Sequence, residues 1–183
     1  MIKLDRTKIT INLKALSSNL KYASALAPGK KIMSVIKADG YGHGAFRVAK
    51  TLKASNSFAV ARLEEAEDLR MAGVSSPVCV LEGVSSEQDL RRARELGLQL
   101  MVHSWHQIDL YKKYGSDVPV WLKIDSGMGR LGFDIHQCSE VFNSLNGLNL
   151  IGIISHLSHA DDVSSNRTEE QLQLLSKEIL PIA

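Results

Sequence analysis

The 183-residue sequence has few aromatic residues, two cysteines and almost no excess of charge. Aromatic residues make up 5% and the formal net charge is +2, so neither a stacking platform nor a basic face for nucleic acid is expected. No apolar run approaches the ~18 residues of a membrane-spanning helix, and residues 1–6 lack the apolar core of a signal peptide. Cys79 and Cys138 have no CxxC spacing for a metal or redox pair. We therefore expect a cytoplasmic protein with no nucleic-acid or membrane partner.

The sequence does contain a regular alternation of short apolar runs with amphipathic helical segments. The apolar runs cover residues 32–36, 58–61, 77–81, 98–102, 118–124 and 150–154. Helices are predicted over residues 12–26, 63–71, 87–96, 105–114, 136–145 and 168–180, the first with Asn12 as its N-cap. About six strand–helix units of this kind predict an α/β fold with a parallel sheet and right-handed crossovers.

Two architectures fit this alternation. One is a complete open sheet of six strands, and the other is a TIM-type (β/α)8 barrel, which needs about 250 residues and would be incomplete here. A doubly wound dinucleotide domain carries G-x-G-x-x-G after its first strand, whereas residues 37–44 read Lys-Ala-Asp-Gly-Tyr-Gly-His-Gly. The bulky Tyr41 and His43 would disturb that packing. The incomplete barrel is favoured, with no internal domain boundary.

A lysine at the end of the first apolar run is the clearest chemical signal. Burying an ammonium costs several kcal/mol unless it is paired or neutralised, and a neutral lysine amine is nucleophilic enough to form a Schiff base with an aldehyde. Lys37 is followed by Gly40, Gly42 and Gly44, which let the backbone approach a ligand, and by the Tyr41 hydroxyl. This spacing suits a phosphate-bearing cofactor. The alternative is a solvent-reaching lysine at an ordinary strand-to-helix turn.

A second predicted strand, residues 118–124, also ends at charged residues and is followed by a glycine-rich loop. Residues 123–132 read Lys-Ile-Asp-Ser-Gly-Met-Gly-Arg-Leu-Gly. The planar fork of Arg130 can bind a carboxylate or a phenolate oxygen. The alternative is a loop arginine that forms an ion pair with Asp125 or Asp134.

A third cluster, residues 155–162, reads Ser-His-Leu-Ser-His-Ala-Asp-Asp and again follows an apolar strand. His156 and His159 could ligate a metal, as in metal-dependent barrel hydrolases. Such sites draw ligands from several strand ends, and no second histidine pair follows another strand in this chain. The hydrolase is therefore kept as an alternative, and no metal is assigned.

The decapeptide Val35–Gly44 resembles the pyridoxal 5'-phosphate attachment segment of the alanine racemase family, and residues 123–132 resemble the second signature of that family. The resemblance runs from about Ile11 to the end of the chain. It implies that Lys37 carries the cofactor, with Tyr41, Arg130 and His156 among the cofactor-binding residues, and that Arg130 also contacts the substrate carboxylate. It further implies that Lys123 matches a lysine that is carbamylated in many members and positions the arginine.

The reaction implied by this resemblance is the interconversion of L- and D-alanine, which supplies D-alanine for peptidoglycan, with Lys37 as the base for the D-enantiomer. A non-catalytic barrel protein that binds pyridoxal phosphate is the alternative. Family members continue into the rest of the barrel and a C-terminal β domain, and form homodimers in which the partner supplies a tyrosine on the opposite face. We therefore expect residues 1–183 to be the N-terminal part of such a barrel, inactive alone.

Overall fold

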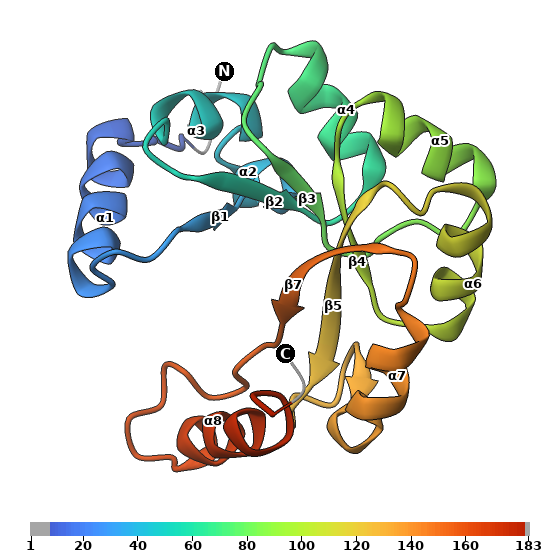
Figure 1. The fold of residues 1–183 in the computed structure, drawn as a ribbon. Helices are drawn as coiled ribbons and strands as arrows, with labels where there is room; N and C mark the ends of the chain where they lie inside the picture. Colours follow the sequence, from blue (N-terminus) through green and yellow to red (C-terminus); the bar gives the residue numbers. More distant parts are fainter. Residues whose placement is uncertain (1–7, 182–183) are drawn as a thin grey trace, which may run out of the picture.

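The structure is a computed structural model that describes residues 8–181. Its sheet contains six parallel strands in sequential order (Figure 1). They are β1 (Met33–Val35), β2 (Ser57–Val60), β3 (Val78–Val80), β4 (Gln99–Val102), β5 (Pro119–Asp125) and β7 (Asn149–Ile154). A two-residue strand, β6 (Phe133–Asp134), pairs with the end of β5.

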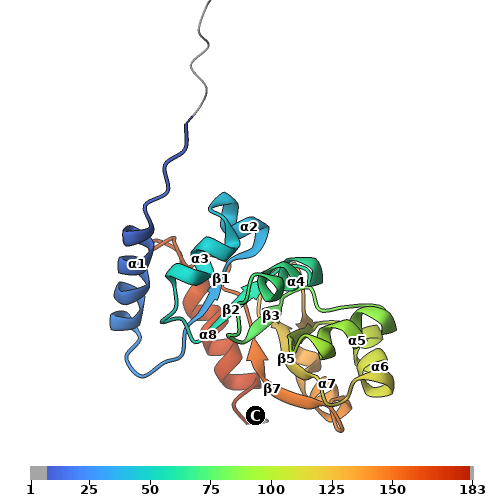
Figure 2. The same cartoon turned by 90° about the horizontal axis from the view of Figure 1, so that it is seen from above.

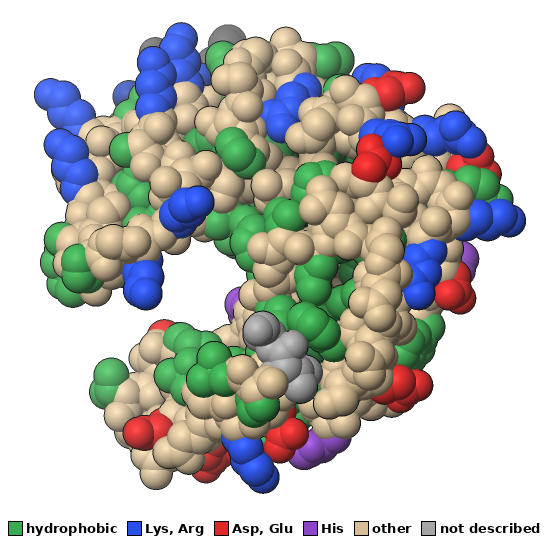
Figure 3. All heavy atoms as spheres, in the orientation of Figure 1, with side chains coloured by type: hydrophobic (Ala, Val, Ile, Leu, Met, Phe, Trp, Pro, Cys, Tyr) green, Lys and Arg blue, Asp and Glu red, His purple; other side chains and the backbone are tan. Residues whose placement is uncertain are grey.

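The strand order separates the two architectures that the sequence left open. Each of the five strands after β1 pairs with the preceding one of the six. The strand order therefore never reverses, as it does in a doubly wound sheet. The sheet curves progressively, and β1 and β7 lie at its two edges (Figure 1). An open notch separates the two ends of the curve, and hydrophobic side chains line its inner wall (Figure 3). The prediction of an incomplete barrel of about six units is therefore confirmed.

The helices lie around the outside of the curved sheet (Figure 1). They are α1 (Leu13–Leu26), α3 (Ala45–Thr51), α4 (Leu63–Met71), α5 (Glu87–Glu95), α6 (Trp105–Tyr114), α7 (Cys138–Ser144) and α8 (Arg167–Glu178), with a 3₁₀ turn, η1 (Ile135–Gln137), before α7. Helix α1 lies beside α3 at one end of the sheet (Figure 2). Asn12 caps α1 as predicted, and its side chain accepts the Ala15 N–H at 3.1 Å. The short α3 was not predicted, because seven residues directly after a glycine turn carry little periodic signal.

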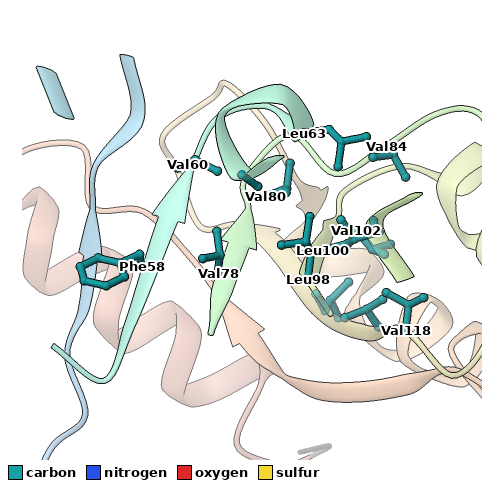
Figure 4. Close-up of a cluster of buried hydrophobic side chains, with 14 of the residues drawn as sticks. Phe58, Val60, Leu63, Val78, Val80, Val84, Leu98, Leu100, Val102 and Val118 are labelled. Carbon is teal, nitrogen blue, oxygen red and sulfur yellow. The ribbon is translucent and has the colours of Figure 1, made fainter. Parts of the chain in front are cut away.

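Alternation along the strands builds two buried layers. Side chains such as Val60, Val80 and Leu100 face the helices and form the main hydrophobic core (Figure 4). The intervening residues face the inside of the curve, where Trp121 lies over Gly152 so closely that a Cβ there would be 2.5 Å from the indole ring. By the same alternation, Lys123 lies on the inner face of β5.

Both cysteines are buried and free. Burial raises the pKa of the Cys79 thiol to about 12, so this thiol stays protonated at neutral pH. None of the helices within residues 8–181 combines the length and the apolarity needed to cross a membrane.

Candidate active site

The carboxyl ends of parallel strands meet at one edge of the sheet, so the three loops that the sequence singled out come together there. Lys37 follows β1, the glycine-rich loop with Arg130 follows β5, and His156 follows β7. The last two loops are neighbours, because Lys123 on β5 pairs in register with Ile154 on β7.

The segment that carries Lys37 is a left-handed turn, α2 (Lys37–Gly42). Ala38, Asp39, Gly40 and Tyr41 all have φ between 51° and 64°. The left-handed conformation costs about 1–2 kcal/mol for each residue with a side chain, so surrounding contacts must stabilise this turn. The Asp39 carboxylate accepts the Ala45 N–H at 2.7 Å, and the Gly40 N–H donates to the Ile36 carbonyl at 2.9 Å.

Glu65, at the start of α4, is a further support of this turn that our sequence analysis missed. One carboxylate oxygen accepts the Ala38 N–H at 2.5 Å, and the other accepts the N–H groups of Ala61 at 2.7 Å and Arg62 at 3.0 Å. The capping-box position of Glu65, three residues after Arg62, was the available signal. Glu65 therefore ties the residue after Lys37 to the junction of β2 and α4.

The side chains of the turn depart in part from expectation. Lys37 is half-buried. The free-energy cost of burying its ammonium group is therefore smaller than we expected from its position at the end of a strand. Tyr41 is 59% exposed. The His43 ring lies 3.0 Å and 2.9 Å from the carbonyls of Gly40 and Tyr41 through Nδ1. Because carbonyls only accept, Nδ1 carries the proton and His43 closes the turn.

The loop after β5 is wrapped around a single carboxylate. The Asp125 side chain accepts the N–H groups of Gly127, Met128 and Gly129, each at 2.8 Å, and that of Arg130 at 3.2 Å. Burial raises the pKa of this carboxyl, but the four hydrogen bonds outweigh burial and leave the pKa below its ordinary value.

Arg130 is exposed and has no carboxylate within 4.0 Å among residues 8–181. The alternative of an ion pair with Asp125 or Asp134 is therefore wrong for this structure. Asp125 instead uses its oxygens on the loop backbone, and Asp134 accepts the His136 N–H at 2.8 Å. The Arg130 guanidinium remains available to an external anion.

Lys123 is the buried lysine of the site. It is 5% exposed, and its Nζ donates to the Ile124 carbonyl at 3.2 Å. Burial lowers its pKa, Asp125 opposes this, and the Arg130 charge lowers the pKa further. The net lowering increases the fraction of neutral amine.

The pKa of His156 is affected by charges from the other two loops. Burial lowers its pKa, and the charges of Arg130, Lys123 and Lys37 lower it further. His159 instead pairs through Nδ1 with the Ser158 hydroxyl at 2.8 Å. No group of three or more His, Cys, Asp or Glu side chains suited to a metal is found in the described part of the chain, so the hydrolase alternative lacks a third ligand there.

A family model described as "Alanine racemase, N-terminal domain" matches residues 11–179. The chain belongs to the alanine racemase family. Enzymes of this family are isomerases that depend on pyridoxal phosphate. The alanine racemase of Coxiella burnetii (strain CbuG_Q212) is 40% identical over an alignment of 176 residues that covers 93% of this chain and 48% of the relative. That of Nitrosococcus oceani is 44% identical over an alignment of 169 residues that covers 89% of this chain and 48% of the relative.

Solved racemases share the fold. The biosynthetic alanine racemase of Pseudomonas aeruginosa superposes with a TM-score of 0.85 at 34% identity, over 93% of this chain and 49% of that one. The Bacillus anthracis alanine racemase, solved with bound L-Ala-P, gives a TM-score of 0.80 at 31% identity, over 90% of this chain and 45% of that one. The chain spans about half the length of the curated relatives it matches.

Asp125→Asn tests whether one carboxylate organises the Arg130 loop. An asparagine keeps one acceptor oxygen, but its NH₂ group would face backbone N–H donors, so we expect a loss of roughly 1–2 kcal/mol in the free energy of unfolding. Urea titration measures this. Asp134→Asn is the matched control and should cost less than about 0.5 kcal/mol, because asparagine caps as well as aspartate. Equal stability of Asp125→Asn and the parent would contradict the loop assignment.

The same contact gives a pH dependence with a defined sign. The pKa of Asp125 is lower in the folded state than in the unfolded state, so its contribution is present above the unfolded pKa of about 3.9 and is lost as the pH falls through the folded pKa. The Asp125→Asn variant should therefore lose less stability than the parent on acidification below about pH 4.

Proposed function

We propose that this chain supplies the lysine-bearing side of an alanine racemase site that interconverts L- and D-alanine. The observation that carries the proposal is that Lys37, Lys123, Arg130 and His156 all lie at, or directly after, the carboxyl ends of strands in one parallel sheet. The names of the relatives support alanine as the substrate. The absence of a ligating cluster around His156 within residues 8–181 makes the racemase preferable to the hydrolase.

The residues at this edge fit pyridoxal phosphate, which carries a phosphate, a phenolic oxygen and an aldehyde. Several cationic groups from three strand ends suit an anionic group, and the Arg130 fork has no carboxylate partner among the described residues. When bound, the cofactor supplies an electron sink for negative charge at the substrate Cα. A non-catalytic barrel that only binds pyridoxal phosphate is less well supported, because it has no substrate carboxylate for Arg130 to bind.

The chain's own residues would take separate roles. Lys37 would hold the cofactor through its amine, and that amine would move the proton at Cα that belongs to the D-enantiomer. Arg130 would orient the substrate carboxylate through its planar fork and hold the ring oxygen of the cofactor. The His156 ring, whose pKa burial and the neighbouring cations lower, would support the cofactor as a neutral hydrogen-bonding group, and Tyr41, being exposed, would reach it only on ligand binding.

We further propose that residues 1–183 form the N-terminal part of a pyridoxal-phosphate-binding barrel that acts as a homodimer. Strands β1 and β7 each have one partner and lie at the edges of the sheet, and unpaired parallel edges are closed in a complete barrel. The solved racemases match this chain over about half of their length. The cytoplasmic location stays a prediction.

Borohydride trapping tests the proposed function. Reduction in the presence of pyridoxal phosphate, followed by peptide mapping, should place a stable adduct on Lys37, and Lys37→Ala should abolish it. Lys50→Ala on α3, an exposed lysine, should leave the adduct unchanged. The experiment is run on the chain alone and on the chain combined with the C-terminal half of the Pseudomonas aeruginosa enzyme, with racemisation followed by chiral chromatography. A principal adduct on another lysine would overturn the assignment.

Arg130→Lys, measured in that combined protein, tests the carboxylate contact. Lysine keeps the charge but loses the two-point fork, so kcat/KM for alanine should fall by the equivalent of about 2–4 kcal/mol. Arg91→Lys is the control, because Arg91 pairs with Glu87 on the surface of α5. Unchanged kcat/KM in Arg130→Lys would remove Arg130 from the site.

Lys123 is proposed to be carbamylated. The lone pair of its neutral amine would attack the carbon of CO₂, an N–C bond would form, one C=O π pair would move onto oxygen, and one proton would leave to solvent. Burial of the amine favours the neutral reactant. Carbon NMR in ¹³C-labelled bicarbonate should show a carbamate signal that disappears in Lys123→Met. A spectrum without that signal in the parent chain would exclude the modification.

A further inference from the structure

We infer that Gln171, on α8, is a positioning residue that fixes the Arg130 loop and the His156 loop relative to each other; this role rests on the proposed function. Gln171 is 1% exposed, although glutamine side chains are mostly exposed in proteins. Its side chain connects the loop after β5 with the loop after β7.

Every hydrogen-bonding position of the Gln171 amide is used. Nε2 donates to the Ser126 hydroxyl and to the His156 carbonyl, each at 3.0 Å. Oε1 accepts the Ser158 N–H at 2.9 Å and the Ser158 hydroxyl at 3.0 Å. Two donors and two acceptor positions are the full capacity of this group, so the amide is completely satisfied despite its burial.

Backbone groups determine the orientation of the amide. The His156 carbonyl can only accept and the Ser158 N–H can only donate, so Nε2 must face the first and Oε1 the second. A flipped amide would place the NH₂ group opposite the Ser158 N–H and the amide oxygen opposite the His156 carbonyl. Gln171 therefore holds the backbone on either side of Leu157 in one geometry, directly beside His156.

The network continues from Gln171 to β5. Ser126 Oγ lies 2.8 Å from Ser155 Oγ, and Ser155 Oγ donates to the Ile124 carbonyl at 3.0 Å. Since the Ser155 proton is used on Ile124, the Ser126 proton must point to Ser155, which leaves Ser126 Oγ to accept from Gln171. One directed chain thus runs from α8 to the carbonyl that also accepts from Lys123 Nζ.

Direct packing reinforces the chain. A Cβ built on Gly127 would lie 3.6 Å from Gln171 Cγ, so the stem of Gln171 lies against the loop that leads to Arg130. An apolar side chain of the same size would fill this space but would leave the His156 carbonyl and the Ser158 N–H without their partners. The polar amide therefore adds orientation of the two loops, which packing alone does not specify.

The test compares Gln171→Met and Gln171→Asn, both uncharged, with the control Gln173→Met, an exposed glutamine on the same helix. The readout is the titration of His156, followed by NMR in the chain without cofactor. In both Gln171 variants the loops should separate, and the pKa of His156 should move up towards its ordinary value as the cations of the other loops recede. The combined protein carrying Gln171→Met should lose roughly 100-fold in kcat/KM, the scale expected for a misplaced site group.

Each outcome decides the role of Gln171. A folded Gln171→Met or Gln171→Asn variant with an unchanged His156 titration would overturn the proposal, even if its melting temperature falls. Gln171→Asn is neutral and keeps a donor and an acceptor, but it is one methylene too short to reach both loops, so it remains informative if the methionine variant does not fold. Failure of Lys37 to take up pyridoxal phosphate in the parent would refute the proposed function, while the NMR comparison would still decide whether Gln171 positions the loops.

Discussion

The parallel alignment of the six strands is the constraint on which the rest of this structure depends. Because each strand runs in the same direction as its neighbour, Lys37, Lys123 and His156 are delivered to one edge from positions up to 119 residues apart. The outer faces of the strands supply the apolar core with the helices. The carboxyl edge is thereby left free to carry polar groups.

Carboxylates near this edge are used on the backbone rather than on the cations. Asp125 accepts four N–H groups, Glu65 accepts three, and Asp39 accepts the N–H of Ala45. A carboxylate held in this way is satisfied where it stands and orders its loop. This use of acidic groups leaves the positive charge of Arg130 unpaired within the described chain, which is what recognition of an anionic ligand requires.

The turn at Lys37 illustrates how local cost and tertiary support are balanced. Three non-glycine residues adopt the left-handed conformation, which their own preferences oppose. Contacts from Glu65 on α4 and from the start of α3 hold them there. Gln171 performs a comparable task on the other side of the site, where α8 joins two loops. The site is thus supported from helices that contribute no cationic side chain to it.

Local patterns in the sequence were sufficient for the strand–helix alternation, for the cap at Asn12 and for the three strand-end motifs, because these depend on residues close together along the chain. The positive φ of Gly40, Gly42 and Gly44 was also predictable from residue type. Only the tertiary structure decided that Lys123 is buried while Lys37 is half-buried, and that Glu65 and Gln171 support the loops. These outcomes depend on contacts between residues up to 45 positions apart, such as Gln171 with Ser126, and no local preference specifies them.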